Sequence, residues 1–503
     1  MSRKLILILL FSIAVSFHSK GWAEEFIQVP AAIHISSTVS DGKHTIPEIV
    51  AIAKQSNLKA VILTDDVLMR WEYGLWPLRR IIKKTVEQKS IFKYGIKKYL
   101  NQIENVQKES PDLLLLAGFE CAPFYYWEGN VFNSSLKMRN WHKHILAMGL
   151  ENVKDWENLP VLGNNQGLLL PFHFKNIINF WPFVILLTGI LCLNKKKFSY
   201  ADFRGRKLGP YSRRWRALGA LLIIIGLFFS FNNYPFLDFR FDQYHGDLGI
   251  MPYQNLIDYI NQRGGLTFWA HPEAKNNQEI DGMKILTEEN TSDLPLVSNY
   301  TGFAIFYEGY NKVGIPGGIW DDMLKQYCQG KRKTPVWIIA GLSFDSERNL
   351  SDYMKDLRNI LLVPRLSKSE VLRALRDGRM YVVNGTASAQ FILDKFVIGD
   401  DSIAAGKIMG QELELEGKPR LEISGHFLDG RSQLFKIKLI RNGRIIEILE
   451  ANSPFNLSYQ DEYDGKDKKI YYRIDAESQG LHIVTNPIFI KQKDKKILAV
   501  SGK

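Results

Sequence analysis

The amino-acid sequence predicts an α/β protein: a TIM-like barrel that is interrupted by a transmembrane helical hairpin and followed by an antiparallel β-sandwich. Three observations carry this prediction. A strand-helix-strand pattern opens the body of the chain over residues 33–66, and two long apolar runs without charge follow near the middle. Short strands of alternating polarity fill the last part. Each pattern has its own period or length, so each indicates a different kind of structure.

The length and the N-terminus indicate a folded protein that is exported. With 503 residues, of which 46% are hydrophobic and 23% charged, the chain exceeds one ordinary core, and we expect two soluble domains. A basic start, an apolar run over residues 5–17 and small residues before position 24 are typical of a signal peptide over residues 1–23. An uncleaved anchor is the alternative, although the run is shorter than the roughly 20 residues of a membrane span.

Cysteine content and charge narrow the class of protein further. Cys121, Cys192 and Cys328 are an odd and sparse set that gives no disulfide framework, although a bridge between Cys121 and Cys328 stays open. The net charge of +12 is concentrated between residues 194 and 216, where nine Lys and Arg stand against one Asp. Basicity that is confined to one interval does not indicate a nucleic-acid partner.

The cationic interval lies between two apolar runs, residues 176–193 and 217–237, that contain no charged residue. Each run is long enough, or nearly so, to cross a bilayer as a helix. Trp181, Trp215 and Tyr234 lie near the ends of the runs, and a positive loop is typical of the cytoplasmic side. We therefore predict a membrane hairpin with its loop inside and both ends outside; two buried core helices are the alternative.

Side chains that bind metals stand at the ends of the predicted strands. The first strand ends on His34 and is followed by Ser40-Asp41-Gly42, and the second ends on Thr64-Asp65-Asp66. Because the strands of such a unit run parallel, both ends emerge on one face, where barrel enzymes assemble their chemistry. Later apolar runs are bordered by residues of the same kind, namely Glu120, His144, His271, Asp345 and Glu347. The nearby His44, His142 and His245 are interpreted as solvent-exposed or capping.

In this order the motifs resemble those of the PHP (polymerase and histidinol phosphatase) family of metal-dependent phosphoesterases. The family patterns H-x-H, S-D-G and T-D-H are matched in part by His34-Ile35-Ser36, Ser40-Asp41-Gly42 and Thr64-Asp65-Asp66. The resemblance continues to Glu347, so the apolar runs form an insertion within it. It implies a distorted TIM-like (β/α)7 barrel, divalent metal ions (Mn, Zn, Fe or Mg) as cofactors, and hydrolysis of phosphoesters or related esters by a metal-activated water.

The resemblance also implies a set of metal ligands: His34, Asp41, Asp66, Glu120, His144, His271, Asp345 and Glu347. Three family histidines are replaced, by Ser36, Asp66 and Glu347. Glu120, His144 and His271 would form an intact site, whereas Asp41, Asp66 and Glu347 would form an all-carboxylate site suited to a harder ion. The alternative reading of these replacements is a catalytically inactive PHP-like protein that binds or scaffolds an envelope glycan, lipid or protein.

Aromatic and cationic residues next to these motifs are candidates for substrate binding. Arg70, Trp71 and Arg79 follow the second strand, in a segment between Asp66 and position 112 that we expect to be mostly helical, and Tyr125 follows Glu120. An anionic ester would suit the arginines, and aromatic faces would suit a sugar ring or a lipid headgroup. The alternative is that the aromatic residues belong to the core beside a solvated basic helix.

The last part of the chain has a different sequence pattern. A helix over residues 368–377 is followed by short alternating strands, with Asn442-Gly443 as a hairpin turn, which predicts an antiparallel β-sandwich. We therefore expect a signal peptide (1–23), a barrel in two parts (26–167 and 242–387), a hairpin insertion (168–241) and a sandwich (388–495). The expected partners are a small-molecule or envelope ester and the membrane, with the soluble domains in the periplasm or at the cell exterior.

Overall fold

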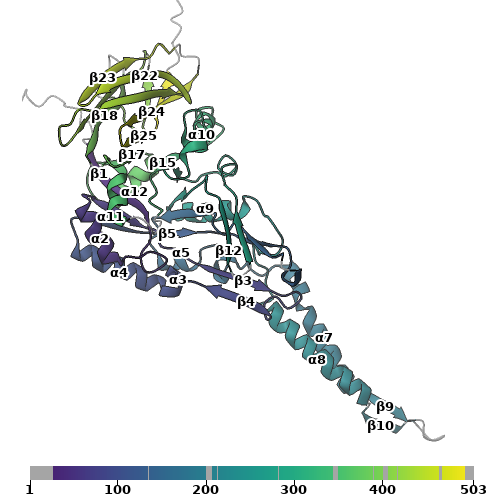
Figure 1. Ribbon diagram of the computed structural model, residues 1–503. Coiled ribbons are helices and arrows are strands. Elements are labelled where there is room, and N and C mark those ends of the chain that lie inside the picture. The colour runs from purple at the N-terminus through teal and green to yellow at the C-terminus, as the bar shows by residue number, and fades with distance from the viewer. Residues whose placement is uncertain are drawn as a thin grey trace, which may run out of the picture.

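The computed structural model describes residues 26–133, 135–199, 207–211, 213–280, 283–343, 349–388, 390–399, 406–415, 417–463 and 467–492. Its architecture is mixed α/β with one large sheet, so the predicted α/β class is confirmed (Figure 1). The predicted signal peptide, residues 1–23, lies outside the described residues, and so do the predicted ligands Asp345 and Glu347.

The part of the chain built around seven central strands is called the body. The spatial order of these strands is β15-β14-β11-β8-β5-β2-β1. Their bounds are β1 (Ile27–Ile35), β2 (Ala60–Leu63), β5 (Leu114–Cys121), β8 (Ile145–Met148), β11 (Leu266–Trp269), β14 (Gly302–Ala304) and β15 (Trp337–Ile339). A parallel bridge between Ile33 and Gly341 links the chain just after β15 back to β1, and Leu342 N donates to Ile33 O at 2.9 Å. Several of these strands, such as β2 and β15, are buried on both faces, as their continuous apolar runs require.

The direction of β8 differs from that of its neighbours. β8 is antiparallel to both β5 and β11, whereas the pairs β1–β2, β2–β5, β11–β14 and β14–β15 are parallel. Ile145, the first residue of β8, pairs with Cys121 at the end of β5 and with Trp269 at the end of β11. The residue that precedes β8 therefore lies beside the residues that follow β5 and β11.

Helices cover the strands with their apolar sides. The longer ones are α2 (Ile46–Gln55), α4 (Ile96–Glu109), α9 (Met251–Asn261), α10 (Ile319–Cys328), α11 (Leu350–Asp356) and α12 (Lys368–Asp377), and the short ones are α3 (Ile91–Tyr94), α5 (Val153–Glu157) and α6 (Asn165–Leu168). Thr45 and Glu48 form a capping box at the start of α2, which fixes the helix between the first two strands. The predicted bounds of α12 are confirmed.

The segment after Asp66 is not mostly helical as predicted. Its first part is a β-hairpin of β3 (Arg70–Gly74) and β4 (Lys83–Glu87), and α3 and α4 follow. Trp71 and Tyr73, on one side of β3, place their rings 5.8 and 5.2 Å from the ring of Trp127. Such tertiary contacts decide between strand and helix where local preference is weak. Trp127 belongs to a second sheet, β12 (Asn276–Ile280), β13 (Met283–Thr287), β7 (Lys137–Arg139) and β6 (Tyr126–Glu128).

The C-terminal part, which we call the sandwich, consists of two β-sheets that pack around a hydrophobic core of their own. One sheet contains β18 (Phe391–Gly399), β20 (Arg420–Phe427) and β23 (Phe455–Gln460). The other sheet continues from β1 through β16 (Leu357–Val363) and β17 (Met380–Asn384) to β25 (Leu481–Thr485), β24 (Lys469–Ser478), β21 (Leu434–Arg441) and β22 (Arg444–Asn452). β26 (Ile488–Gln492) pairs with β24, and β19 (Glu412–Leu415) pairs with β26. Phe391 and Phe435 meet between the sheets at 4.8 Å. The predicted turn is confirmed, because Asn442 and Gly443 have φ angles of 46° and 75°.

The two apolar runs form a stalk that projects from the body (Figure 1). It consists of η2 (Phe174–Phe180), α7 (Trp181–Leu193) and α8 (Arg213–Asn233), with β9 (Lys196–Ser199) and β10 (Lys207–Tyr211) at the tip. A Cβ atom on Gly219 would lie 2.6 Å from Gly189 O, so the helices touch through glycine. Two spans, Phe174–Leu193 (η2 together with α7) and Arg213–Asn233 (α8), are long and apolar enough to cross a membrane, and only 17% and 11% of their apolar stretches is buried. This exposure is unlike that of core helices.

The three cysteines are free thiols. The bridge between Cys121 and Cys328 that the sequence left open is therefore not formed. Cys121 and Cys192 are buried and Cys328 is half-buried, and burial raises the pKa of the Cys121 and Cys328 thiols. Such thiols are inert, so their role is packing.

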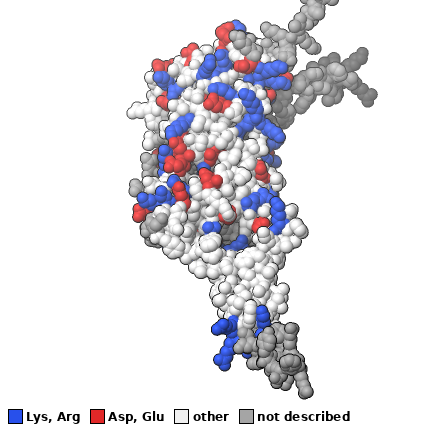
Figure 2. All heavy atoms as spheres, turned by 90° about the vertical axis from the view of Figure 1, so that its right-hand side faces the viewer, with Lys and Arg blue, Asp and Glu red and all other residues white. Residues whose placement is uncertain are grey.

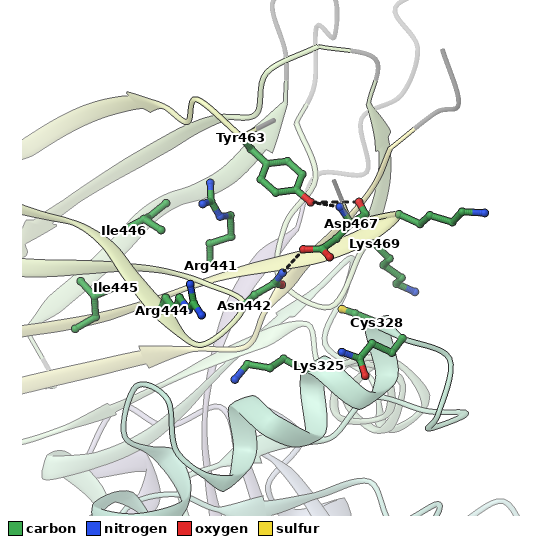
Figure 3. A pocket seen from close by; sticks show the side chains of 12 residues that line it. Lys325, Cys328, Arg441, Asn442, Arg444, Ile445, Ile446, Tyr463, Asp467 and Lys469 are labelled. Carbon is green, nitrogen blue, oxygen red and sulfur yellow. Dashed lines mark hydrogen bonds between the residues drawn. The ribbon is translucent and has the colours of Figure 1, made fainter. Parts of the chain in front are cut away.

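A buried ion pair joins the body to the sandwich. Arg473 on β24 and Asp321 on α10 are both fully buried, and the guanidinium donates to the carboxylate at 2.9 and 2.6 Å. Tyr471 Oη and Gly317 N donate to the same carboxylate at 2.8 and 2.7 Å. Beside this contact, α10 and the turn after β21 enclose a cavity of about 760 Å³ with Lys325 on its wall (Figure 3).

The buried pair predicts that substitutions of the adjacent Asp321 and Asp322 have very different effects on the free energy of unfolding. Asp321→Asn would leave Arg473 as a buried charge without a counter-charge, and we expect a loss of about 3–5 kcal/mol in unfolding free energy. Asp322→Asn is the matched control, because Asp322 forms an exposed pair with Lys325 and such pairs contribute about 0–1 kcal/mol. Urea unfolding followed by tryptophan fluorescence measures both; equal effects would contradict the role given to the buried pair.

Candidate metal centre

Three predicted ligands come together at one end of the central strands. Glu120 is next to last in β5, His144 directly precedes β8, and His271 follows β11. One ligand atom of each lies within 4.8 Å of the others. The reversed direction of β8 is what brings His144, at the amino end of its strand, to the carboxyl ends of β5 and β11.

The carboxylate of Glu120 is the centre of this cluster. Its Oε1 atom lies 2.6 Å from His144 Nδ1 and 3.6 Å from His271 Nε2, and its Oε2 atom lies 2.8 Å from His34 Nε2. His34 has a φ angle of 70°, which turns its side chain toward Glu120 at the end of β1. A Cβ atom on Gly341 would lie 3.2 Å from His34 Nδ1, so glycine makes room for this ring.

Several polar atoms of the cluster have no hydrogen-bond partner among the described residues. These buried atoms are His34 Nδ1, Glu120 Oε1, His144 Nδ1 and His144 Nε2. His144 Nδ1 is close to Glu120, but the contact lacks hydrogen-bond geometry. A buried polar atom without a partner costs about 1–3 kcal/mol, and imidazole nitrogens with a carboxylate form a ligand set that suits Zn, Fe or Mn. The residues therefore fit a divalent metal ion.

The electrostatics of Glu120 agree with this arrangement. Burial by itself would raise the pKa of the carboxyl, but the adjacent imidazoles of His34, His144 and His271 lower it well below its usual range. Glu120 is consequently an anion at neutral pH. An anionic carboxylate that faces several imidazoles can bind a metal ion without first losing a proton.

Asp65 and Asp66 are adjacent in the sequence but have different surroundings. Asp65 is fully buried and its carboxylate accepts from Ser37 N at 2.7 Å and from Ser40 Oγ at 2.9 Å. Asp65 thus anchors the 37–42 loop. The pKa of Asp66 is raised well above its usual range, first by burial and then by the charges of Glu120 and Asp41. The backbone of Asp66 also forms a parallel β-bridge with the backbone of Glu120.

The other predicted ligands do not belong to the cluster of Glu120, His144 and His271. Asp41 is exposed at the surface of the 37–42 loop, near enough to act on the pKa of Asp66. Ser36, which the sequence resemblance aligns with a histidine, is half-buried. Because Asp345 and Glu347 lie outside the described residues, the sets that include them stay predictions.

A second group of possible ligands lies in the sandwich, where Asp475, Glu477 and His482 have atoms within 4.8 Å of one another. Lys438 Nζ lies 2.7 Å from Glu477 and 3.5 Å from Asp475. Tyr310 Oη donates to Asp475 at 2.7 Å. Side chains of the protein thus pair with both carboxylates, so the group needs no ion.

The four predicted substrate-binding residues lie on or beside the β3–β4 hairpin. Arg70 and Trp71 are half-buried on β3, and Arg70 Nε has no hydrogen-bond partner among the described residues. The Arg79 guanidinium covers the ring of Tyr244 at 4.0 Å. Tyr125 is 1% exposed, and its hydroxyl accepts from Glu72 N at 2.9 Å. Tyr125 therefore acts as a packing residue beneath β3, while the Arg70 guanidinium lies beside Glu72, with Nη2 3.9 Å from Glu72 Oε2.

His142 is a residue that the sequence interpretation missed. It is half-buried rather than exposed, and its ring centroid lies 5.7 Å from that of His144. Its Nε2 atom is buried without a partner among the described residues. Burial, and then the charges of His144 and His271, lower its pKa to about 4, so the ring is neutral at neutral pH. The H-x-H spacing of positions 142 and 144 could have indicated it.

No family model and no curated protein matches the chain. Among solved structures, it is similar to a two-domain protein from Bacteroides vulgatus that contains a predicted PHP-like metal-dependent phosphoesterase, with 11% identity, a TM-score of 0.33 and 90% of each chain covered. It is also similar to a proposed metal-dependent phosphoesterase from Bifidobacterium adolescentis, with 13% identity, a TM-score of 0.26, and 62% of this chain and 87% of that chain covered. At such scores these likenesses decide nothing about the activity of this chain.

The contrast between Asp65 and Asp66 can be tested with isosteric variants. Asp65→Asn would remove acceptor capacity for the hydrogen bonds from Ser37 and Ser40, and we expect faster amide hydrogen exchange in residues 37–42 and a loss of about 1–3 kcal/mol in stability. Asp66→Asn should leave exchange in that loop unchanged. Hydrogen-exchange mass spectrometry of the two variants checks this; equal exchange in both would refute the anchoring role.

Proposed function

We propose that the chain is a membrane-anchored, extracytoplasmic metal-dependent hydrolase of phosphoesters or related esters, of the PHP type. The observation that carries the proposal is the cluster of Glu120, His144 and His271, whose atoms converge and in part lack other partners. The motif order from His34 to Glu347 supports the family assignment, and the seven central strands with the Ile33–Gly341 bridge support a closed barrel.

In this proposal the ion is held by Glu120, His144 and His271, and His34 lies against the other oxygen of the same carboxylate. A bound divalent ion would polarise a phosphoryl oxygen and lower the pKa of a bound water to near neutrality. Glu120 contributes the negative charge that balances the ion. The guanidinium of Arg70, at the start of β3, is suited by its charge to bind and orient the anionic ester.

The burial of Asp66 suggests a further role for this residue. Its raised pKa means that the carboxyl gives up its proton less readily than an exposed aspartate. A divalent ion bound at Glu120 would offset the neighbouring carboxylates that raise this pKa. Asp66 is therefore our candidate for an additional ligand of the proposed centre.

The stalk supports the proposed anchor. Its side chains are apolar and exposed, for example Val184, Leu187 and Leu191 on α7 and Leu221 and Phe228 on α8, which is costly in water but favourable in lipid. The cationic residues gather at its tip (Figure 2), as the positive-inside rule requires of a cytoplasmic loop. The body and the sandwich would then both lie outside the cytoplasm.

The second candidate is a catalytically inactive PHP-like binding protein, and one observation favours it. Ser36 stands where a family histidine would face the cluster, so one proposed site has lost a ligand. The two candidates differ in metal content, because a binding protein that has lost its sites would hold none.

Metal analysis of the detergent-purified chain tests the proposal. After supply of Mn, Zn, Fe and Mg and removal of excess, we expect stoichiometric metal in the native chain and its loss in the His144→Ala, His271→Ala double variant. His426→Ala is the matched control, because His426 also contacts a carboxylate, Asp394, at 2.8 Å, but on the exposed sandwich surface. Metal absent from the native chain, or unchanged in the double variant, would refute the metal centre.

Cysteine labelling in intact cells tests the topology. In a Cys328→Ser background, a membrane-impermeant maleimide should label Leu428→Cys on the sandwich of intact spheroplasts. Asn194→Cys, next to the cationic tip, should be labelled only after lysis, because the tip would lie in the cytoplasm. Labelling of both positions before lysis would contradict a membrane-spanning stalk.

A further inference from the structure

Large apolar side chains surround the point where the stalk leaves the body. Trp76, in the turn between β3 and β4, is 79% exposed, and Phe172, Phe174 and Tyr234 are 60%, 78% and 69% exposed. We call these four residues the collar. Trp76 comes from the body, more than ninety positions before the stalk helices, so the collar is not merely a continuation of the apolar runs.

Hydrogen bonds hold the segments of the collar together. Arg80 N donates to Asn232 Oδ1 at 3.0 Å, and Arg80 Nη1 donates to Tyr234 O at 2.8 Å, which joins the β3–β4 turn to the end of α8. Leu170 N donates to Asp238 O at 3.0 Å, which joins the chain before η2 to the chain after α8. The white surface of the stalk continues onto the adjoining end of the body (Figure 2).

The collar and the candidate metal centre occupy the same end of the body. β3 begins four residues after Asp66, and its backbone is bound by the side chains that follow Glu120: Tyr125 accepts from Glu72 N, and Trp127 Nε1 donates to Glu72 O at 2.9 Å. The sandwich is attached at the opposite end, because β16 pairs with Ile27–Ala31 of β1, away from His34. Figure 1 accordingly shows sandwich and stalk on opposite sides of the body.

The β3–β4 hairpin between the metal centre and the collar is cationic. Between Arg70 and Glu87 it carries five Lys and Arg against two Glu. Aromatic residues with a cationic border are typical of surfaces that lie in the headgroup region of a bilayer. Anionic phosphates of lipid headgroups would meet this border first, and Arg70, the first residue of β3, lies at its inner end.

We propose that the collar lies in the headgroup region of the outer leaflet and holds the metal centre beside it, so that the substrate is a phosphoester of a membrane lipid. The substrate class rests on the proposed hydrolase function; the docking of the collar on lipid does not. In this arrangement β3 lies between the cluster and the bilayer surface, and the sandwich faces away from the membrane.

Lipid-borne quenching tests the docking. In the Cys328→Ser background, an environment-sensitive probe is attached at Trp76→Cys, Phe172→Cys or Leu428→Cys of the full chain. The protein is reconstituted into vesicles of phosphatidylethanolamine and phosphatidylglycerol with brominated acyl chains. We expect loss of fluorescence at positions 76 and 172 and none at 428, an equally apolar position that is 61% exposed on the sandwich. A collar probe as bright as the sandwich probe overturns the proposal. A collar probe shielded from both bromolipid and aqueous iodide overturns it too, and assigns the collar to a contact with a second copy of the chain.

Relative hydrolysis rates test the substrate class. Phosphatidic acid in vesicles is compared with soluble p-nitrophenyl phosphate, using the Trp76→Ser, Phe172→Ser variant and the Leu428→Ser control. We expect the lipid-to-soluble ratio to fall about tenfold in the collar variant only, since it loses apolar area that lipid would bury. Hydrolysis of the soluble ester alone, with unquenched collar probes, overturns this proposal and leaves the hydrolase function standing. Quenched collar probes without hydrolysis of either ester refute the hydrolase function and the substrate class but support the docking.

Discussion

One buried carboxylate determines the arrangement of the candidate site. Glu120 lies inside the body, where an ionised group is costly unless opposite charges or hydrogen bonds surround it. His34, His144 and His271 supply these neighbours from the ends of three separate strands. Their ring nitrogens lie 2.8, 2.6 and 3.6 Å from the carboxylate oxygens of Glu120. The left-handed backbone of His34, the glycine at 341 and the reversal of β8 all serve this convergence. Since several of the facing nitrogens lack other partners, metal binding would contribute to the stability of the fold as well as to chemistry.

Parts of this arrangement follow from the sequence, and the reasons are local. The helix over Lys368–Asp377 has an amphipathic pattern between a serine cap and a glycine stop, and the structure gives the same bounds. Asn442-Gly443 encodes its turn because both residues accept a positive φ. Glu120, His144 and His271 stood out because each borders a short apolar run.

Other parts depend on contacts that no local pattern contains. Four apolar residues in a row, as in β8, do not encode the direction of a strand, so the reversal could not be predicted. The β3–β4 hairpin carries a helix-like mixture of aromatic and basic residues, and it is a strand because Trp71 and Tyr73 meet Trp127. His142 was set aside because its burial depends on the sheet that packs over it.

The pairing of β1 has a consequence for the order of events during synthesis. β1 lies between β2, its near neighbour in sequence, and β16, whose residues emerge from the ribosome more than three hundred positions later. The bridge from Ile33 to Gly341 has nearly the same separation. The first strand must therefore wait with one edge open while the stalk and the later strands are made. A contact of such long range slows folding, and an unpaired edge in the interval can associate with other chains. Early termination of translation at any point before β16 would leave a product in which the second edge of its first strand has no β16 to pair with.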